Sequence, residues 1–251
     1  MELHKFGWIP DTEDVRDYYY SLSDQSGSEE LPRYAHCRRG LPAAYDQEGL
    51  NTAVPAAIAD ALAVERSRCG LPALVPSRLY TYWYARFREA AGASLSDNGC
   101  SIRDCLKALK REGLCRENMW PYSHDMVNVK PGPYAYAAAE RPGIASYERV
   151  PYDLATIKHV INSGHAVICG TLMYPGYDSL ECECTGDIPM PESKDVPIGA
   201  HCVLLIGYDD SLQCFVFRNS RGPQWGWIGL GRMPYDYATL ETTDLWIINC
   251  K

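Results

Sequence analysis

The sequence predicts an α+β protein in which a helical lobe is followed by a β lobe. From about residue 45 to 140 apolar residues recur at helical spacing, whereas from about 141 to 251 they form short runs separated by turns. Helices that precede strands, instead of alternating with them, are typical of α+β architecture. A chain of 251 residues is long enough to bury two packed lobes of this kind.

The helical half is predicted to begin at a position suited to chemistry. A loop over 45–55 leads into an Ala-rich helix that ends near Arg68, and Asn51 and Thr52 are good N-cap residues. Ala53 is therefore expected at a helix N-terminus. Free N–H groups and the helix dipole stabilise an anion at such a position.

The remaining elements follow from apolar periodicity and turn residues. Further helices are predicted over 76–90 and 101–110, and residues 1–44 are expected to form an extended arm over the surface. The loop over 174–199 is too long for a simple connection, which makes it a candidate binding loop. The β half is expected to contain an extended piece at 149–151, a helix at 154–161, and strands at 166–172, 203–206, 215–217 and 245–248.

Composition narrows the class of function. The formal net charge of -8 argues against nucleic acid as the main partner, because phosphate binding needs clustered Lys and Arg. No apolar run approaches the length of a membrane span, so we expect no membrane partner. The eleven cysteines are many for this length. Several lie in apolar strand-like runs and no signal peptide precedes them, so we expect mostly buried thiols in a reducing setting.

Two stretches near the C-terminus carry the candidate chemistry. His201 stands at the start of an apolar strand, and Asn219 opens an Asn-Ser-Arg-Gly-Pro-Gln-Trp-Gly run just after the next strand. A strand, a turn and a second strand would place the imidazole beside the side-chain amide, a pair suited to acid–base work. A single histidine on an apolar strand is more often a core residue, so this interpretation depends on the rest of the pattern.

Together with Gln47 before a helix N-terminus, this pattern resembles the papain-like cysteine peptidases. The run over 219–231 nearly completes that family's Asn-Ser-Trp-Gly-x-x-Trp-Gly-x-x-Gly-x-Gly motif, and the resemblance covers most of the chain. It implies a two-lobe fold with a β-barrel-like second lobe and an active-site cleft between the lobes. It also implies hydrolysis of peptide or protein substrates by a thiolate paired with an imidazolium, without cofactor or metal.

The resemblance also assigns roles to single residues. His201 would be the base and Asn219 would orient its ring. Gln47 would form an oxyanion hole with the backbone N–H at the helix start, a contact worth roughly 3 to 4 kcal/mol in the transition state. Substrate-binding positions are implied at Asn98, Gly99, Cys100, Ala200 and Trp225.

The nucleophile position departs from the family. Six residues after Gln47, where the family places its cysteine, this chain has Ala53, and neither Cys37 nor Cys69 lies where it could replace that residue. The chain as written should not form an acyl-enzyme. We favour an engineered Cys→Ala exchange in a peptidase, since the other site residues survive. The alternatives are a natural pseudo-peptidase that binds peptides, and an acyl-transferase or ligase on the same fold.

Other departures concern the surroundings of the site. Arg221 replaces the family's tryptophan that shields the His–Asn hydrogen bond, which leaves that bond either wetter or covered by the guanidinium plane. We expect no long inhibitory prosegment of the family's kind. The chain looks most like a microbial or viral branch of the family, and we expect an intracellular or virion-packaged protein. The oligomeric state stays open.

Two further features have simpler interpretations. Gly164-His165-Ala166-Val167 also looks like the base motif, but no Asn-Ser-x-Gly run follows it at strand-plus-turn distance, so we expect a surface or strand-start histidine. Cys182 and Cys184 form a lone Cys-x-Cys pair without the second pair that structural zinc sites show. We therefore predict no metal site.

Overall fold

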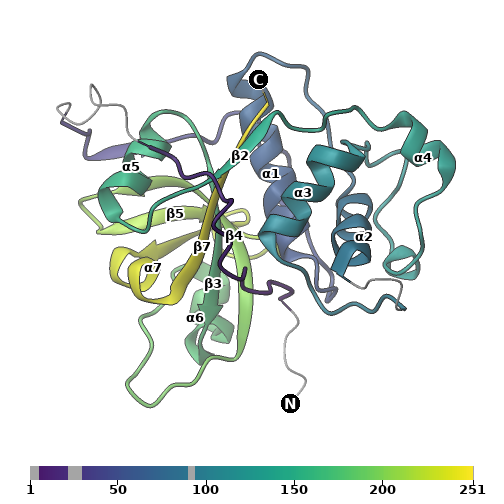
Figure 1. The fold of residues 1–251 in the computed structure, drawn as a ribbon. Helices are drawn as coiled ribbons and strands as arrows, with labels where there is room; N and C mark the ends of the chain where they lie inside the picture. The colour runs from purple at the N-terminus through teal and green to yellow at the C-terminus, as the bar shows by residue number, and fades with distance from the viewer. Residues whose placement is uncertain (1–5, 22–29, 90–93, 251) are drawn as a thin grey trace.

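The computed structural model describes residues 6–21, 30–89 and 94–250, and it has two lobes side by side (Figure 1). One lobe carries α1 (Ala53–Arg68), α2 (Arg78–Glu89), α3 (Ile102–Glu112) and the short α4 (Pro133–Ala138). The other is built on an antiparallel sheet with α5 (Leu154–Asn162) and α7 (Tyr235–Glu241) packed on it. As predicted, α1 to α4 precede most of the strands, although one short strand at 34–36 comes before them and α5 and α7 lie among the later strands.

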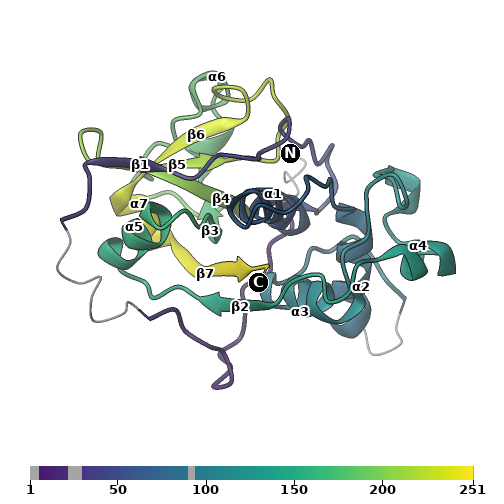
Figure 2. The same ribbon diagram turned by 90° about the horizontal axis from the view of Figure 1, so that it is seen from above.

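Helix α1 lies between the two lobes, with α2 and α3 on one side and the sheet on the other (Figure 2). Its alanines are buried around most of the helix circumference, which is typical of a helix enclosed by protein. Small side chains let both lobes approach the helix backbone. Thr52 is the N-cap residue as expected, but its side chain makes no capping bond, because the hydroxyl instead lies 2.7 Å from the Tyr122 hydroxyl.

The sheet has the strand order β2-β7-β3-β4-β5-β6, and β1 pairs with β4 off this path. Strand β4 is the longest and pairs with β3 on one side and β5 on the other, with Thr171 opposite His201. The strands span β1 (Tyr34–His36), β2 (Ser146–Arg149), β3 (Val167–Met173), β4 (Gly199–Asp209), β5 (Cys214–Arg218), β6 (Leu230–Pro234) and β7 (Thr242–Asn249).

The sequence did not indicate β6 or α7. Strand β6 contains Gly231 and ends at Pro234, and both residue types weaken a strand signal. It forms because β5 offers it a paired edge, with Val216 opposite Arg232. The predicted extended piece at 149–151 is also shifted, since β2 ends at Arg149.

The N-terminal arm does not simply cover the surface as expected. Phe6 and Trp8 are buried between the lobes, and the arm then runs along the front of the molecule (Figure 1). Asp17 anchors it by accepting hydrogen bonds from Arg103 on α3 and Arg149 on β2. The part of the arm at 1–5 and 22–29 lies outside the described residues.

All eleven cysteines are free thiols, and eight of them are buried. Among the described helices, none combines the length and the apolar character needed to cross a bilayer.

Candidate active site

Two donors at the start of α1 converge on one carbonyl oxygen. The backbone N–H of Ala53 donates to the Phe6 carbonyl at 3.2 Å, and Nε2 of Gln47 donates to the same oxygen at 3.3 Å. Gln47 is itself held in place, because its Nε2 also donates to the Leu50 carbonyl at 2.6 Å. Two fixed donors aimed at one oxygen form the arrangement of an oxyanion hole.

Strands β4 and β5 bring the imidazole and the amide together. Nε2 of His201 lies 2.9 Å from Oδ1 of Asn219, and that oxygen also accepts from the Ser220 backbone N–H at 2.9 Å. Because Oδ1 can only accept, Nε2 carries the proton in the neutral ring. Nδ1 then presents a lone pair. Nδ1 is buried and has no hydrogen-bond partner within the described part of the chain.

The charge state of His201 follows from its burial. The side chain is 0% exposed, and burial lowers the pKa of His201 to about 4, with Arg221 lowering it further and the Asn219 hydrogen bond raising it. A buried imidazole without a counter-anion stays neutral at pH 7. In this chain no thiolate is present at position 53 to stabilise the imidazolium.

The two half-sites are joined across the lobes. The Ser220 hydroxyl donates to Oε1 of Gln47 at 2.8 Å, and the Gln47 backbone N–H donates to the Ser220 carbonyl at 2.9 Å. Phe6 contacts both half-sites, since its carbonyl accepts from the two donors at the start of α1 and its ring centroid is 5.2 Å from that of His201. The residues at 47, 53, 201 and 219 therefore belong to one site.

The residues expected to bind substrate backbone instead hold the chain's own arm. Cys100 donates its N–H to the Gly7 carbonyl at 3.1 Å and accepts from the Ile9 N–H at 3.1 Å, while the Ala200 carbonyl accepts from the Trp8 N–H at 3.2 Å. Asn98 and Gly99 come directly before this contact, with the Asn98 N–H donating to the Ser96 carbonyl at 3.0 Å and Gly99 at a positive φ of 87°. A side chain at Gly99 would collide with the Gly7 backbone, since an added Cβ would lie 2.5 Å from the Gly7 oxygen.

The arm also fills the side-chain space of the cleft. Trp8 is 3% exposed, and its indole lies directly over Gly170 on β3, where an added Cβ would be 2.3 Å from the ring. The Phe6 ring covers Gly199 in the same way, at 2.1 Å from an added Cβ. Two glycines on the β lobe thus make room for two aromatic side chains.

Comparison with known proteins decides the family. The uncharacterized peptidase C1-like protein L477 of Acanthamoeba polyphaga mimivirus is 31% identical over 214 residues, which cover 81% of this chain and 68% of that protein. The chain belongs to the peptidase C1-like family, the papain-like cysteine peptidases. No protein-family profile matches the chain.

Solved structures agree on the papain-like fold. Xylellain, a cysteine protease from Xylella fastidiosa, is similar with a TM-score of 0.91 and 30% identity, covering 99% of this chain and 97% of xylellain. A Carica candamarcensis cysteine protease in complex with E-64 is 16% identical with a TM-score of 0.66, covering 87% of this chain and 99% of that structure. The second likeness concerns the fold alone, and the two-lobe prediction is confirmed.

Within this papain-like site, Trp225 lies deeper than expected. It is buried, with its ring centroid 5.8 Å from Phe217 and 6.0 Å from Tyr177. The Trp225 ring, expected at a substrate-binding position, is therefore covered by Tyr177, whose ring centroid is 5.7 Å from that of His201. Sequence reasoning missed Tyr177. The only signal was indirect, namely that Arg221 stands where the family has a tryptophan.

The other flagged residues lie outside the site. Of the two alternatives for His165, the strand start holds, because it stands two residues before β3. Its side chain is only 13% exposed, and Nδ1 lies 3.4 Å from the Glu65 carboxylate near the far end of α1. Cys182 is buried on the short α6 (Leu180–Thr185), and Cys184 is exposed. No group of three or more His, Cys, Asp or Glu among the described residues is placed to hold a metal ion.

Buried cysteines elsewhere in the chain are poor substitutes for the nucleophile. Burial raises the pKa of Cys37 and of Cys182 to about 12, and it raises the pKa of Cys202, next to His201, well above the ordinary thiol value. A thiol must ionise to attack a carbonyl, so these groups stay inert at neutral pH.

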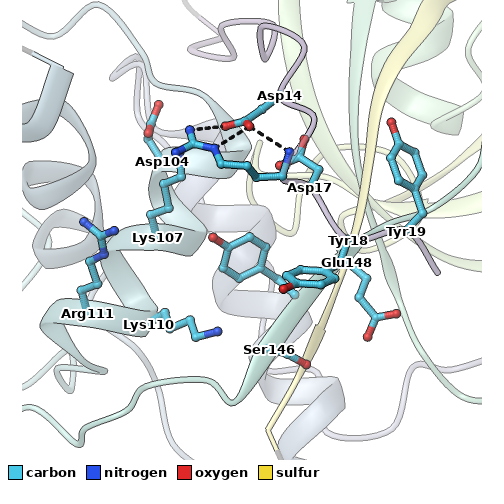
Figure 3. A pocket seen from close by; sticks show the side chains of 12 residues that line it. Asp14, Asp17, Tyr18, Tyr19, Asp104, Lys107, Lys110, Arg111, Ser146 and Glu148 are labelled. Atoms are coloured by element: carbon cyan, nitrogen blue, oxygen red, sulfur yellow. Dashed lines mark hydrogen bonds and ion pairs between the residues drawn. The ribbon is translucent and has the colours of Figure 1, made fainter.

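A separate hollow of about 650 Å³ lies between the arm, α3 and β2 (Figure 3). Arg16 and Asp14 form an ion pair at 2.7 Å on its rim, and Lys107 and Lys110 of α3 line it from the helical lobe. It contains none of the papain-like site residues.

Proposed function

We propose that the active form of this protein hydrolyses peptide bonds with a cysteine at position 53, and that the chain with Ala53 retains peptide binding without the covalent step. The observation that carries the proposal is Nδ1 of His201. It is buried and lacks a partner among the described residues, while Asn219 fixes the opposite nitrogen. A buried acceptor without a partner is costly, and a thiol at the start of α1 would supply its proton.

The chemistry follows from the two half-sites. A thiol at position 53 would give its proton to Nδ1, and the helix N-terminus would stabilise the thiolate. The sulfur then attacks the substrate carbonyl, whose oxygen takes the place of the Phe6 carbonyl between the two donors. The imidazolium returns its proton to the leaving amine, and water releases the acyl group. Ala53 lacks the sulfur and stops this sequence at binding.

Retention of the whole surrounding site supports an exchange of cysteine for alanine in a competent peptidase. The alternative, a natural pseudo-peptidase that binds peptides, is supported by the arm itself. Its backbone is held by the residues at 53, 100 and 200 with no covalent bond. An acyl-transferase or ligase would use the same geometry with an amine in place of water.

The test is to install the thiol. Ala53→Cys should be labelled once by an epoxide inhibitor such as E-64, and the label should be lost in Ala53→Cys combined with His201→Gln. The matched control is Ala56→Cys, which places a buried thiol one turn further along α1. A folded Ala53→Cys protein that resists labelling would contradict the peptidase proposal. Product analysis with an added amine separates hydrolysis from acyl transfer.

We also propose a reducing, intracellular or virion-packaged location. The support is the set of eleven free thiols, eight of them buried. Thiol titration of the protein from its natural source, unfolded without reductant, should find all eleven free. Paired cysteines in that measurement would exclude the proposal.

A further inference from the structure

One buried aromatic residue contacts both His201 and Asn219 from a segment that the family motif does not include. Tyr177 lies on the 3-10 turn η3 (Pro175–Asp178), within the long loop before β4. It is 1% exposed. The position is far from the motif in sequence, yet the loop brings it against both His201 and Asn219.

The Tyr177 hydroxyl fixes the orientation of the Asn219 amide. Nδ2 of Asn219 donates to the Tyr177 hydroxyl at 3.0 Å, while Oδ1 faces Nε2 of His201 at 2.9 Å. A flipped amide would point its NH₂ group at the Ser220 N–H and at the protonated nitrogen of His201, two donors facing a donor. The hydroxyl therefore selects the rotamer that keeps the proton on Nε2.

The Tyr177 ring covers the His–Asn hydrogen bond. Its centroid is 5.7 Å from the imidazole, at 53°, and 6.0 Å from the Trp225 ring on its other side. Phe6 packs edge-on against it at 5.6 Å. An apolar ring beside a buried hydrogen bond excludes water and strengthens that bond.

Arg221 holds this turn in place. Its guanidinium carbon lies 5.4 Å from the Tyr177 ring centroid, and Nη1 is 3.1 Å from the Asp178 carboxylate on the same turn. The residue that replaces the family's tryptophan is thus an anchor for a tyrosine supplied by another segment. The cover over the His–Asn bond is present, but it comes from η3.

We propose that Tyr177 is a positioning residue for His201, whose hydroxyl sets the Asn219 amide and whose ring keeps water from the His201–Asn219 hydrogen bond. The significance for catalysis rests on the proposed function, in which His201 is the base. The positioning itself concerns groups that are all present in the chain with Ala53. It can therefore be tested without a nucleophile.

The experiment is ¹⁵N NMR of the His201 imidazole in the full chain with Ala53, with the signal assigned by its loss in His201→Gln. Tyr177→Phe keeps the ring and removes the hydroxyl, so the Nε2–H should persist but exchange with water roughly fivefold faster. Tyr177→Ala removes the cover as well. The His201 pKa should then rise toward its ordinary value by about one unit or more, since water reaches the imidazolium.

The matched control is Tyr174→Ala, which changes a neighbouring tyrosine of the same loop whose hydroxyl bonds Glu241 instead of the site. It should leave the His201 signals unchanged. If Tyr177→Phe leaves Nε2–H exchange as in the parent chain, the hydroxyl has no positioning role. If His201 keeps its parent pKa in a folded Tyr177→Ala protein, the Tyr177 ring does not shield the imidazole from water.

A kinetic experiment adds a second test, which depends on the proposed function. In the Ala53→Cys background, Tyr177→Phe should lower kcat and shift the pH profile of labelling while leaving KM near its parent value. If Ala53→Cys is never labelled, the peptidase proposal fails while the NMR result still decides the role of Tyr177.

Discussion

The two sides of the cleft differ in whether backbone groups or side chains form the site. On the helical side, one of the two donors to the carbonyl oxygen is a backbone N–H, that of residue 53, which is present whatever side chain stands there. The β side depends wholly on side chains, with Asn219 and Tyr177 holding His201. Replacing cysteine by alanine therefore removes the sulfur and leaves both halves assembled. With Ala53 in place, the site is assembled and holds the backbone of the chain's own arm.

The largest effect is expected from releasing the arm, which frees the backbone donors of the helical side. Trp8→Ala removes a buried indole, a truncation that costs about 3–5 kcal/mol, and the arm should leave the cleft while the lobes stay folded. Hydrogen exchange should then accelerate at the amides of Ala53 and Cys100, which donate to arm carbonyls. The control is Tyr18→Ala, an exposed residue of the same arm. Unchanged protection in Trp8→Ala would show that the arm does not depend on the indole.

A somewhat smaller effect is expected from removing one donor on the same side. In the Ala53→Cys background, Gln47→Ala should lower kcat on a peptide substrate about 100-fold, because one of two oxyanion donors is lost. Glu48→Gln is the control, since its exposed side chain points away from the site toward His124. If the two variants are equally active, Gln47 is not a donor in the reaction.

The smallest effect concerns protonation on the β side. The pKa of His201 is lower in the folded chain, at about 4, than its ordinary 6.5. The folded state therefore binds fewer protons than the unfolded state, and His201 costs stability as pH falls from 6.5 through 4. Relative to His201→Gln, the parent chain should lose about 2 kcal/mol at pH 5 compared with pH 7. Chemical denaturation at both pH values measures this, and parallel pH curves would contradict it.

Much of the fold could be predicted because its signals are local. The helix from residue 53, the strands around His201 and the two-lobe class all follow from apolar spacing and from a motif with fixed intervals. Strand β6 could not be predicted in this way, because its Gly and Pro residues are accommodated only once β5 offers a partner.

In the site, too, some residues could be identified from the sequence and others only from the folded chain. Gln47, Ala53, His201 and Asn219 could be proposed together because they stand at the positions that the papain-like motifs give to their site residues, and the structure brings them into one site. Tyr177 could not be proposed, because its role depends on where a long loop folds back. The arm could not be placed either, since Phe6 and Trp8 look like ordinary apolar residues until Gly199 and Gly170 are seen to receive them.

The arm in the cleft has a consequence for any peptide that arrives from solution. A ligand tethered to its own site competes at an effective concentration of about millimolar, whatever its intrinsic affinity. A free peptide that binds the open cleft with micromolar affinity would then bind more weakly in proportion to the fraction of molecules in which the arm has left the cleft. The affinity of such a peptide would thus be set as much by the cost of dislodging Phe6 and Trp8 as by its own contacts in the cleft.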